Sequence, residues 1–208
     1  MPKGTTSRRP RTRAALLEAA LATFAEHGFQ ASTIEQVCSA AGFTRGAFYS
    51  NFSSKEELFL ALFDEHSERI LARLSAALES VPDGELTVGR LVELVSVIEP
   101  AERDWYLVTT EFTLRAIRDP QAGWVLARHD ARLRAALAEG LAAGLARAGL
   151  ALTVPAEEFA RLLVALREGG LAQSYVEPEQ LPPGTLERRF LPALLHTLTV
   201  PRPTPEEN

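Results

Sequence analysis

The residues between positions 44 and 51 carry side chains of the kinds that bind nucleic acids. An arginine such as Arg45 can donate two hydrogen bonds to the edge of a guanine. Hydroxyl and amide groups donate readily to phosphate oxygens. The residues expected to keep much of their side-chain surface free for such contacts are Thr44, Arg45, Ala47, Tyr49, Ser50 and Asn51.

Two predicted helices and a glycine turn must position these side chains. The first helix spans about 33–41 and begins at a capping box, formed either by Thr33 with Gln36 or by Ser32 with Glu35. Gly42 supplies the left-handed residue of a sharp turn. Thr44 then caps a second helix of about two turns, over 45–51.

A helix that short is unstable alone, so packing must hold it. Phe43, Phe48 and Phe52 are its apolar residues and are expected to face inward. A helix, a glycine turn and a short helix form the geometry that places a recognition helix in the major groove of DNA. Directly afterwards, Ser54 and Lys55 combine a helix start with a cation, which suits a phosphate.

The net charge of -5 divides unevenly along the chain. Residues 1–55 hold seven lysines and arginines against three glutamates, so the acidic excess lies entirely in the rest. A basic front on an acidic body can dock one face on a polyanion. A solvated, disordered basic tail is the alternative explanation.

Glycines and prolines divide the chain into about nine helical segments, and no strand alternation is evident. The sequence therefore predicts an all-α fold. We expect a three-helix helix-turn-helix domain followed by a helical bundle. The segments are about 11–26, 33–41, 45–51, 54–80, 86–98, 102–118, 121–148, 155–175 and 185–198.

Residues 11–65 resemble the N-terminal motif of the tetracycline-repressor (TetR) family of transcriptional regulators. The matching positions are Thr33-Ile34, Ala41-Gly42-Phe43, Gly46-Ala47-Phe48-Tyr49, Phe52 and Ser54-Lys55-Glu56-Glu57-Leu58. The resemblance implies that Thr33, Tyr49 and Lys55 clamp phosphates while Thr44, Arg45, Ala47 and their neighbours meet bases. The DNA-binding candidates are thus Thr33, Thr44, Arg45, Gly46, Ala47, Tyr49, Ser50, Asn51 and Lys55.

The expected organisation has four parts. Residues 1–10 form a basic arm that could follow the DNA backbone or minor groove, and 11–55 form the helix-turn-helix domain. Residues 56–199 form the effector-binding and dimerisation domain. Residues 200–208 hold three prolines and no core residue, so we expect a disordered tail.

Cys38 is the single cysteine and stands where the family most often has alanine. No intramolecular disulfide is therefore available, which fits a reducing cytoplasm. We expect Cys38 to be a small buried hydrophobe. A redox sensor, the alternative, needs an exposed thiol of low pKa, and nothing nearby in the sequence favours one.

The segment 102–118 is apolar around most of its circumference, as expected of a helix in the middle of a bundle. Its polar residues need partners or a cavity. The resemblance implies a ligand pocket between helices, and an ordinary core with satisfied polar groups is the alternative. The candidate pocket residues are Trp105, Thr109, Phe112, Trp124 and His129.

The last two helical segments each carry an apolar face, which by the resemblance implies a homodimer with a four-helix interface. The alternative is that these faces complete the core of a monomer. Pro192 should kink the last helix or mark a late start. The candidate interface residues are Phe159, Leu162, Leu163, Leu166, Phe190, Leu194 and Leu198.

The sequence offers little support for catalysis, a cofactor or a metal. The four histidines lie in separate segments, and no phosphate loop or nucleophile motif is recognisable. No apolar run reaches the ~20 residues of a membrane span and no secretory segment is evident, so we expect a soluble, cytoplasmic protein.

The leading hypothesis is a homodimeric repressor released from a palindromic DNA operator by a small-molecule effector of unknown identity. An activator or an effector-independent regulator is the first alternative. A small-molecule enzyme with an accessory DNA-binding head is the second.

Overall fold

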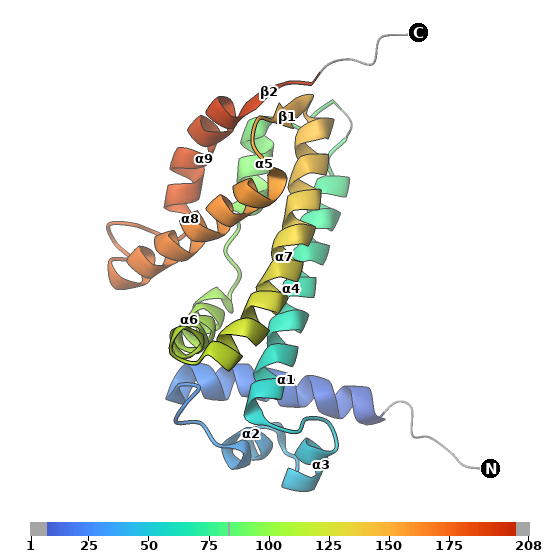
Figure 1. The fold of residues 1–208 in the computed structure, drawn as a ribbon, viewed down its shortest axis with the longest axis vertical. Helices are drawn as coiled ribbons and strands as arrows, with labels where there is room; N and C mark the ends of the chain where they lie inside the picture. The colour runs from blue at the N-terminus through green and yellow to red at the C-terminus, as the bar shows by residue number, and fades with distance from the viewer. Residues whose placement is uncertain (1–7, 83, 203–208) are drawn as a thin grey trace, which may run out of the picture. The chain divides into compact units, whose positions relative to one another are not determined.

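The computed structural model describes residues 8–82 and 84–202, over which the chain forms nine α-helices and two short strands (Figure 1). The prediction of an all-α fold is confirmed. Each predicted helix is present with its ends shifted by at most a few residues. The helices are α1 (Arg8–His27), α2 (Ile34–Ala41), α3 (Arg45–Tyr49), α4 (Lys55–Glu79), α5 (Val88–Val95), α6 (Glu102–Arg118), α7 (Pro120–Arg147), α8 (Ala156–Val176) and α9 (Thr185–Leu198), and the strands are β1 (Leu150–Leu152) and β2 (Thr199–Pro201).

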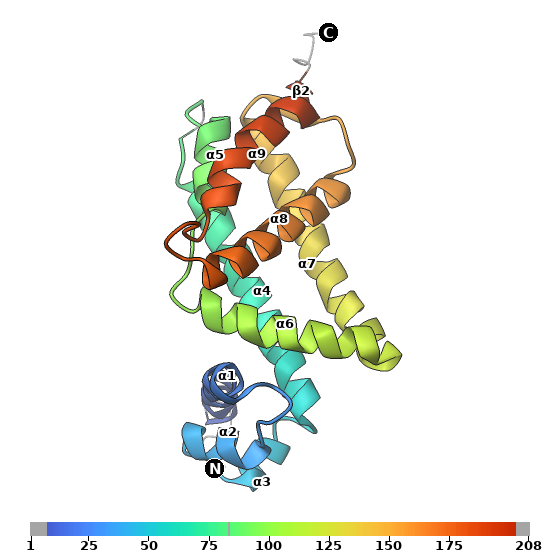
Figure 2. The same ribbon diagram turned by 90° about the vertical axis from the view of Figure 1, so that its left-hand side faces the viewer.

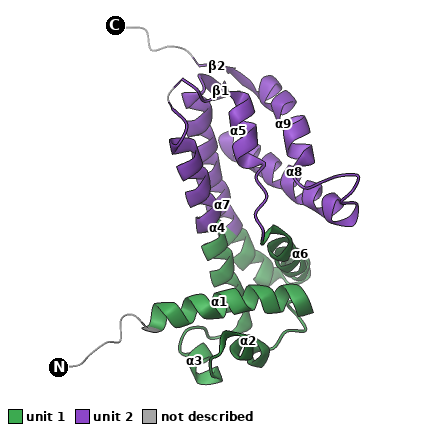
Figure 3. Ribbon diagram, turned by 180° about the vertical axis from the view of Figure 1, so that it is seen from behind, with its two compact units in different colours: residues 1–67, 101–129 green, residues 68–100, 130–208 purple. Residues whose placement is uncertain are grey.

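The chain divides into two compact units, coloured separately in Figure 3. Unit 1 comprises Met1–Ser67 and Ala101–His129, and unit 2 comprises Glu68–Pro100 and Asp130–Asn208. Of the three boundaries between the units, one falls inside α4 and one inside α7, and the third lies between α5 and α6. The helix-turn-helix segment therefore shares its compact unit with α6. The division into functional domains at residue 55 stays a prediction.

Within unit 1, α2 and α3 lie on one side of α1 and α6 lies on the other (Figures 1 and 2). An aromatic core joins α6 and the turn between α1 and α2 to the start of α4. The rings of Phe59 and Phe112 stack with centroids 3.8 Å apart, and Phe29 meets both rings edge-on. None of the three is more than 2% exposed, so this cluster fixes α6 against α4 and the α1–α2 turn.

Unit 2 packs α5 against α9 and α8 against α9 (Figure 2). Its core takes residues from four helices and the loop between α4 and α5. The buried members are Val81, Leu86, Leu91, Val92, Leu145, Phe159, Leu191 and Leu195. Most of the apolar faces predicted on the last two helices therefore face this core.

The two strands pair antiparallel, with Ala151 opposite Val200. Gly149 ends α7 in the left-handed conformation, and its carbonyl accepts a hydrogen bond from the amide of Arg202 at 2.8 Å. The structure thus differs from the expected disordered tail at residues 200–202, where backbone pairing holds the chain. Residues 203–208, the rest of that prediction, lie outside the described residues.

Pro192 lies inside α9, which begins at Thr185, so the proline does not mark a late helix start. Its ring nitrogen cannot donate the helical hydrogen bond to the carbonyl of Arg188. The Pro192 side chain is exposed.

Candidate nucleic-acid interface

A capping box fixes the start of α2. The Thr33 hydroxyl accepts a hydrogen bond from the Gln36 amide at 3.2 Å, and the Gln36 side chain accepts one from the Thr33 amide at 2.8 Å. Of the two pairs that the sequence allowed, this is the one that forms. Thr33 remains exposed, since its cap lies on the helix surface.

The turn between α2 and α3 depends on Gly42, whose φ is 71°. In this left-handed conformation the Gly42 amide reaches the Ser39 carbonyl at 3.2 Å, and the Phe43 amide reaches the Cys38 carbonyl at 2.9 Å. Both bonds satisfy carbonyls left unpaired at a helix end. Thr44 then caps α3 by accepting from the Ala47 amide at 3.3 Å.

Phe48 and Phe52 anchor α3 from inside, at 0% and 2% exposure, as the sequence predicted. Phe43 is half-buried at the corner of the turn. The guanidinium of Arg13, in α1, lies over the Phe52 ring at 5.4 Å. With the aromatic side facing α1, the opposite side of α3 faces solvent.

Arg45 and Tyr49 occupy this outer side, one helical turn apart. The Arg45 guanidinium lies 5.9 Å from the centre of the Tyr49 ring and 2.7 Å from the Glu35 carboxylate in α2. The hydrogen bond with Tyr49, and then the charge of Glu35, raise the pKa of Arg45. Arg45 therefore stays fully charged, and most of its surface is open.

The end of α3 is tied by side chains to its own backbone. The Ser50 hydroxyl and the Asn51 amide nitrogen both donate to the Ala47 carbonyl at 2.8 Å. From α1, Arg9 donates to the Ser50 carbonyl at 3.1 Å. Gly46 is exposed and Ala47 half-buried, so the backbone of this helix is open to close approach.

Lys55 takes a position that the sequence did not indicate. Its ammonium donates to the carbonyls of Phe29, Gln30 and Ser32 at 2.6, 3.1 and 2.8 Å. Burial lowers the pKa of Lys55. An ammonium has three N–H groups, so a phosphate contact by Lys55 requires one of these bonds to be exchanged, and that role stays a prediction.

Glu111, in α6, also stabilises the turn between α1 and α2, whose carbonyls Lys55 binds. The Glu111 carboxylate accepts from the amides of Phe29 and Gln30 at 2.6 and 3.0 Å. One turn further along α6, Arg115 bonds Glu56 at 2.7 Å. Sequence reasoning missed these partners, although polar residues on an otherwise apolar helix were a signal that such partners exist.

The structure brings two of the pocket candidates together around Phe63. The Trp105 ring lies 5.7 Å from Phe63 and stacks on His66 at 3.9 Å. His129 packs edge-on against Phe63 at 6.1 Å and meets Asp64 at 2.6 Å.

The other pocket candidates lie apart from this pair or are already occupied. The Thr109 hydroxyl donates back to the Trp105 carbonyl at 2.9 Å. Phe112 is in the aromatic core, and Trp124 is 63% exposed beneath the Arg128 guanidinium. Ligand contact by any of the five stays a prediction.

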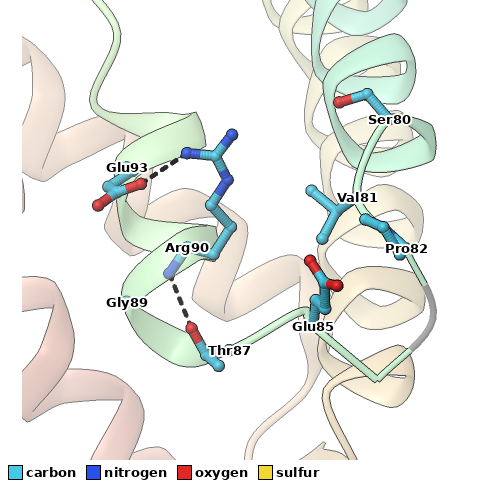
Figure 4. Close-up of a pocket in the computed structure, with 8 residues that line it drawn as sticks. All are labelled: Ser80, Val81, Pro82, Glu85, Thr87, Gly89, Arg90 and Glu93. Carbon is cyan, nitrogen blue, oxygen red and sulfur yellow. Dashed lines mark hydrogen bonds and ion pairs between the residues drawn. The ribbon is translucent and has the colours of Figure 1, made fainter.

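A pocket of about 460 Å³ lies elsewhere, in unit 2, between the end of α4 and the start of α5 (Figure 4). On its α5 side, Arg90 and Glu93 form an ion pair at 2.7 Å. No pocket candidate from the sequence lines it. Its walls are Ser80, Val81, Pro82, Glu85, Thr87, Gly89, Arg90 and Glu93.

The interface candidates on α8 and α9 separate by exposure. Leu162 and Phe190 are 39% and 47% exposed. Phe159 is 1% exposed and belongs to the core of unit 2. The remaining candidates, Leu163, Leu166, Leu194 and Leu198, are half-buried against that core.

Within residues 8–82 and 84–202, no helix has the length and apolar character that crossing a membrane requires. Over the same part of the chain, no group of three His, Cys, Asp or Glu side chains is placed to hold a metal ion.

Two family models match the chain. Residues 16–62 match the model described as bacterial regulatory proteins, tetR family, and residues 72–199 match the C-terminal model of BetI-type transcriptional repressors. The first match contains α2, the Gly42 turn and α3.

Known proteins agree with these models. The chain is 30% identical over 166 residues to the HTH-type transcriptional repressor AcnR of Corynebacterium glutamicum, covering 78% of this chain and 81% of AcnR. Among solved structures, Salmonella enterica GusR is 29% identical with a TM-score of 0.69, covering 93% of this chain and 100% of that one. A transcriptional regulator from Saccharomonospora viridis in complex with choline has a TM-score of 0.67 at 21% identity, covering 90% of this chain and 97% of that one.

Proposed function

The chain belongs to the tetracycline-repressor (TetR) family of DNA-binding transcriptional regulators, and on this premise we propose that α3 reads the bases of its operator. The similar proteins whose names state a function are transcriptional regulators, not enzymes. The observation that carries the proposal is the exposed pair Arg45 and Tyr49, on a short helix that directly follows a glycine turn.

In this proposal Arg45 contacts a guanine edge, and the hydroxyl groups around it contact phosphates. Thr33 and Thr44 support this role because both are exposed at helix N-termini, where backbone amides favour an anion. Lys55 joins the same phosphate surface by exchanging one of its three carbonyl hydrogen bonds for a phosphate oxygen. Together with Arg45 and Tyr49, the remaining contacts are assigned to Gly46, Ala47, Ser50 and Asn51.

We further propose that the regulator binds a palindromic operator as a homodimer. A two-fold dimer presents two recognition helices about 34–36 Å apart, one turn of DNA. The exposed apolar side chains of Leu162 and Phe190 support a partner on α8 and α9. They are the interface candidates with the most surface to bury.

A small-molecule effector that prefers the dimer unable to bind DNA would release the operator by linkage. Repression is proposed over activation because the relative with the printed name AcnR is a repressor. The aromatic residues Phe63 and Trp105 beside His129 support an effector site in this part of unit 1. The choline complex of the Saccharomonospora viridis protein is an example of a small ligand in this fold. A regulator of a bacterial chromosome is expected in the cytoplasm.

Selection of bound fragments from random duplex DNA tests the reader and the dimer together. We expect a palindromic consensus for the unmodified protein. Arg45→Ala and Tyr49→Ala should lose the salt-dependent preference for that consensus. Arg118→Ala is the matched control, since Arg118 is exposed at the end of α6. Unchanged preference in both Arg45→Ala and Tyr49→Ala would overturn the assignment of α3 as the reader.

The effector site has its own experiment. Small molecules are screened for release of the selected operator from the unmodified protein, and the active compound is then tested on Trp105→Leu. We expect this variant to bind the operator normally and to respond only at higher compound concentration. An unchanged response would remove Trp105 from the proposed site.

A further inference from the structure

The only carboxylate that the described residues place in an ion pair with the proposed reading helix is that of Glu35, in the first turn of α2. Glu35 Oε1 lies 2.7 Å from Arg45 Nη1, and both side chains are more than half exposed. An acidic group is costly on a surface that approaches phosphates, because like charges repel. We therefore expect Glu35 to have a role beside Arg45 that offsets this repulsion.

Two neighbouring side chains restrict the position of the Arg45 guanidinium. Glu35 accepts from one terminal nitrogen, and the Tyr49 ring lies 5.9 Å from the guanidinium carbon. A guanidinium has five N–H donors in a rigid planar fork. With one N–H used by Glu35 and one by Tyr49, donors remain for a further acceptor, and the plane in which they point is restricted.

We propose that Glu35 is a positioning residue for base recognition: it holds the Arg45 guanidinium against Tyr49, so that its remaining donors are presented to a guanine edge. This inference rests on the proposed function of α3. Free arginine side chains lose considerable rotamer freedom on binding, and a held side chain has less to lose. Glu35 therefore increases discrimination between bases, and not affinity for DNA as such.

Two simpler roles for Glu35 make different predictions. A negative charge in the first turn of a helix stabilises that helix, so loss of Glu35 would lower the melting temperature without altering base preference. A purely repulsive charge would weaken binding to every duplex by the same factor. Only positioning links Glu35 to the base pair that Arg45 contacts.

The experiment is a double-mutant cycle on Glu35→Gln and Arg45→Ala, measured with the full-length protein. Dissociation constants are measured for the selected operator, for operators substituted at each base pair in turn, and for a random duplex. Glu18→Gln is the charge-matched control, because Glu18 is exposed on α1 and its substitution removes the same charge as Glu35→Gln. Melting temperatures of all variants are recorded beside the binding data.

We expect Glu35→Gln to lower discrimination about two- to fivefold at the base pair sensitive to Arg45→Ala, the range of an exposed ion pair. Discrimination at other base pairs should not change. In the Arg45→Ala background, Glu35→Gln should have no further effect on discrimination. Higher salt should reduce the difference in base discrimination between the unmodified protein and Glu35→Gln, because salt screens the exposed ion pair.

The inference is overturned if Glu35→Gln shifts affinity for all duplexes equally, as Glu18→Gln is expected to do. It is also overturned if Glu35→Gln alters discrimination equally with and without Arg45. Failure of the proposed function looks different: Arg45→Ala would then keep the full base preference of the unmodified protein.

Discussion

Some side chains near the helix-turn-helix segment both hold the fold together and are candidates for DNA contact. Lys55 is the clearest case, because one ammonium closes the α1–α2 turn through three carbonyls. The sequence predicted the inward Phe48 and the outward Arg45, since a two-turn helix must bury its aromatic side. It could not predict the partners of Lys55, which lie more than twenty residues away and meet it only in the folded chain.

Cys38 should be chemically inert in the native protein. Its side chain is 3% exposed, and burial first, then the charge of Glu35, raise the pKa of its thiol. The thiolate, which is the reactive form, is therefore scarce. Alkylation by iodoacetamide at pH 8, followed by mass spectrometry, should be far slower in the native protein than in guanidinium-unfolded protein. Equal rates would contradict the packing role of Cys38.

At the scale of elements, the sequence predicted the helices because caps and breakers are local signals. Thr33, Gly42 and Thr44 each act within four residues of themselves. The pairing of β1 with β2 was missed because it joins residues about fifty positions apart and each strand is too short to alternate. The aromatic contact between α4 and α6 was missed for the same reason of distance along the chain.

The turn between α2 and α3 can be tested with two glycines. Gly42→Ala should cost about 1–2 kcal/mol, since an alanine is forced into the left-handed conformation. Nothing lies within 4 Å of the added Cβ, so the loss measures conformation alone. Gly140→Ala, in the middle of α7 and equally unhindered, should instead stabilise by about 0.5–1 kcal/mol. Urea unfolding gives both values, and a stabilised Gly42→Ala would contradict the turn.

The start of α4 should make stability depend on acid. Burial raises the pKa of Glu56, but the hydrogen bonds from Arg115 and from the Glu56 backbone, with the charges of Arg115 and Lys55, together lower this pKa below its ordinary 4.5. The folded state then binds a proton less readily than the unfolded state, so Glu56 stabilises above pH 4.5, and this contribution is lost as the pH falls through the folded pKa.

The measurement is the free energy of unfolding between pH 6 and pH 3. Glu56→Gln should show a shallower loss of stability over this range than the unmodified protein, and Arg115→Gln should do the same by removing the partner. Identical pH profiles for Glu56→Gln and the unmodified protein would show that the ion pair contributes nothing.

At the scale of the whole molecule, neither compact unit is one continuous stretch of sequence. Local patterns predicted the number and order of helices but not which helices share a core. That grouping depends on contacts such as Phe59 with Phe112, which periodicity cannot indicate. The division of charge along the chain was readable in advance, because it needs only the order of residues.

A variant with Leu162→Asp and Phe190→Asp should be a folded monomer. Both side chains are partly exposed, so the charges are tolerated in one chain but not in a buried contact between two. Light scattering gives the molar mass and circular dichroism the helix content. Loss of the second reader should weaken binding to the palindrome about 100-fold or more. A dimer of unchanged mass would place the interface elsewhere.

The hydrogen bonds from Glu111 to the α1–α2 turn limit how residues 1–55 can be transferred to another regulator. A chimaera that grafts residues 1–55 onto the body of another regulator leaves the amides of Phe29 and Gln30 without their acceptor. It also removes the rings of Phe59 and Phe112, which pack edge-on against Phe29 in the native protein. The transplantable module is therefore residues 1–55 together with the start of α4 and with α6, and a design that exchanges operators must carry all three pieces.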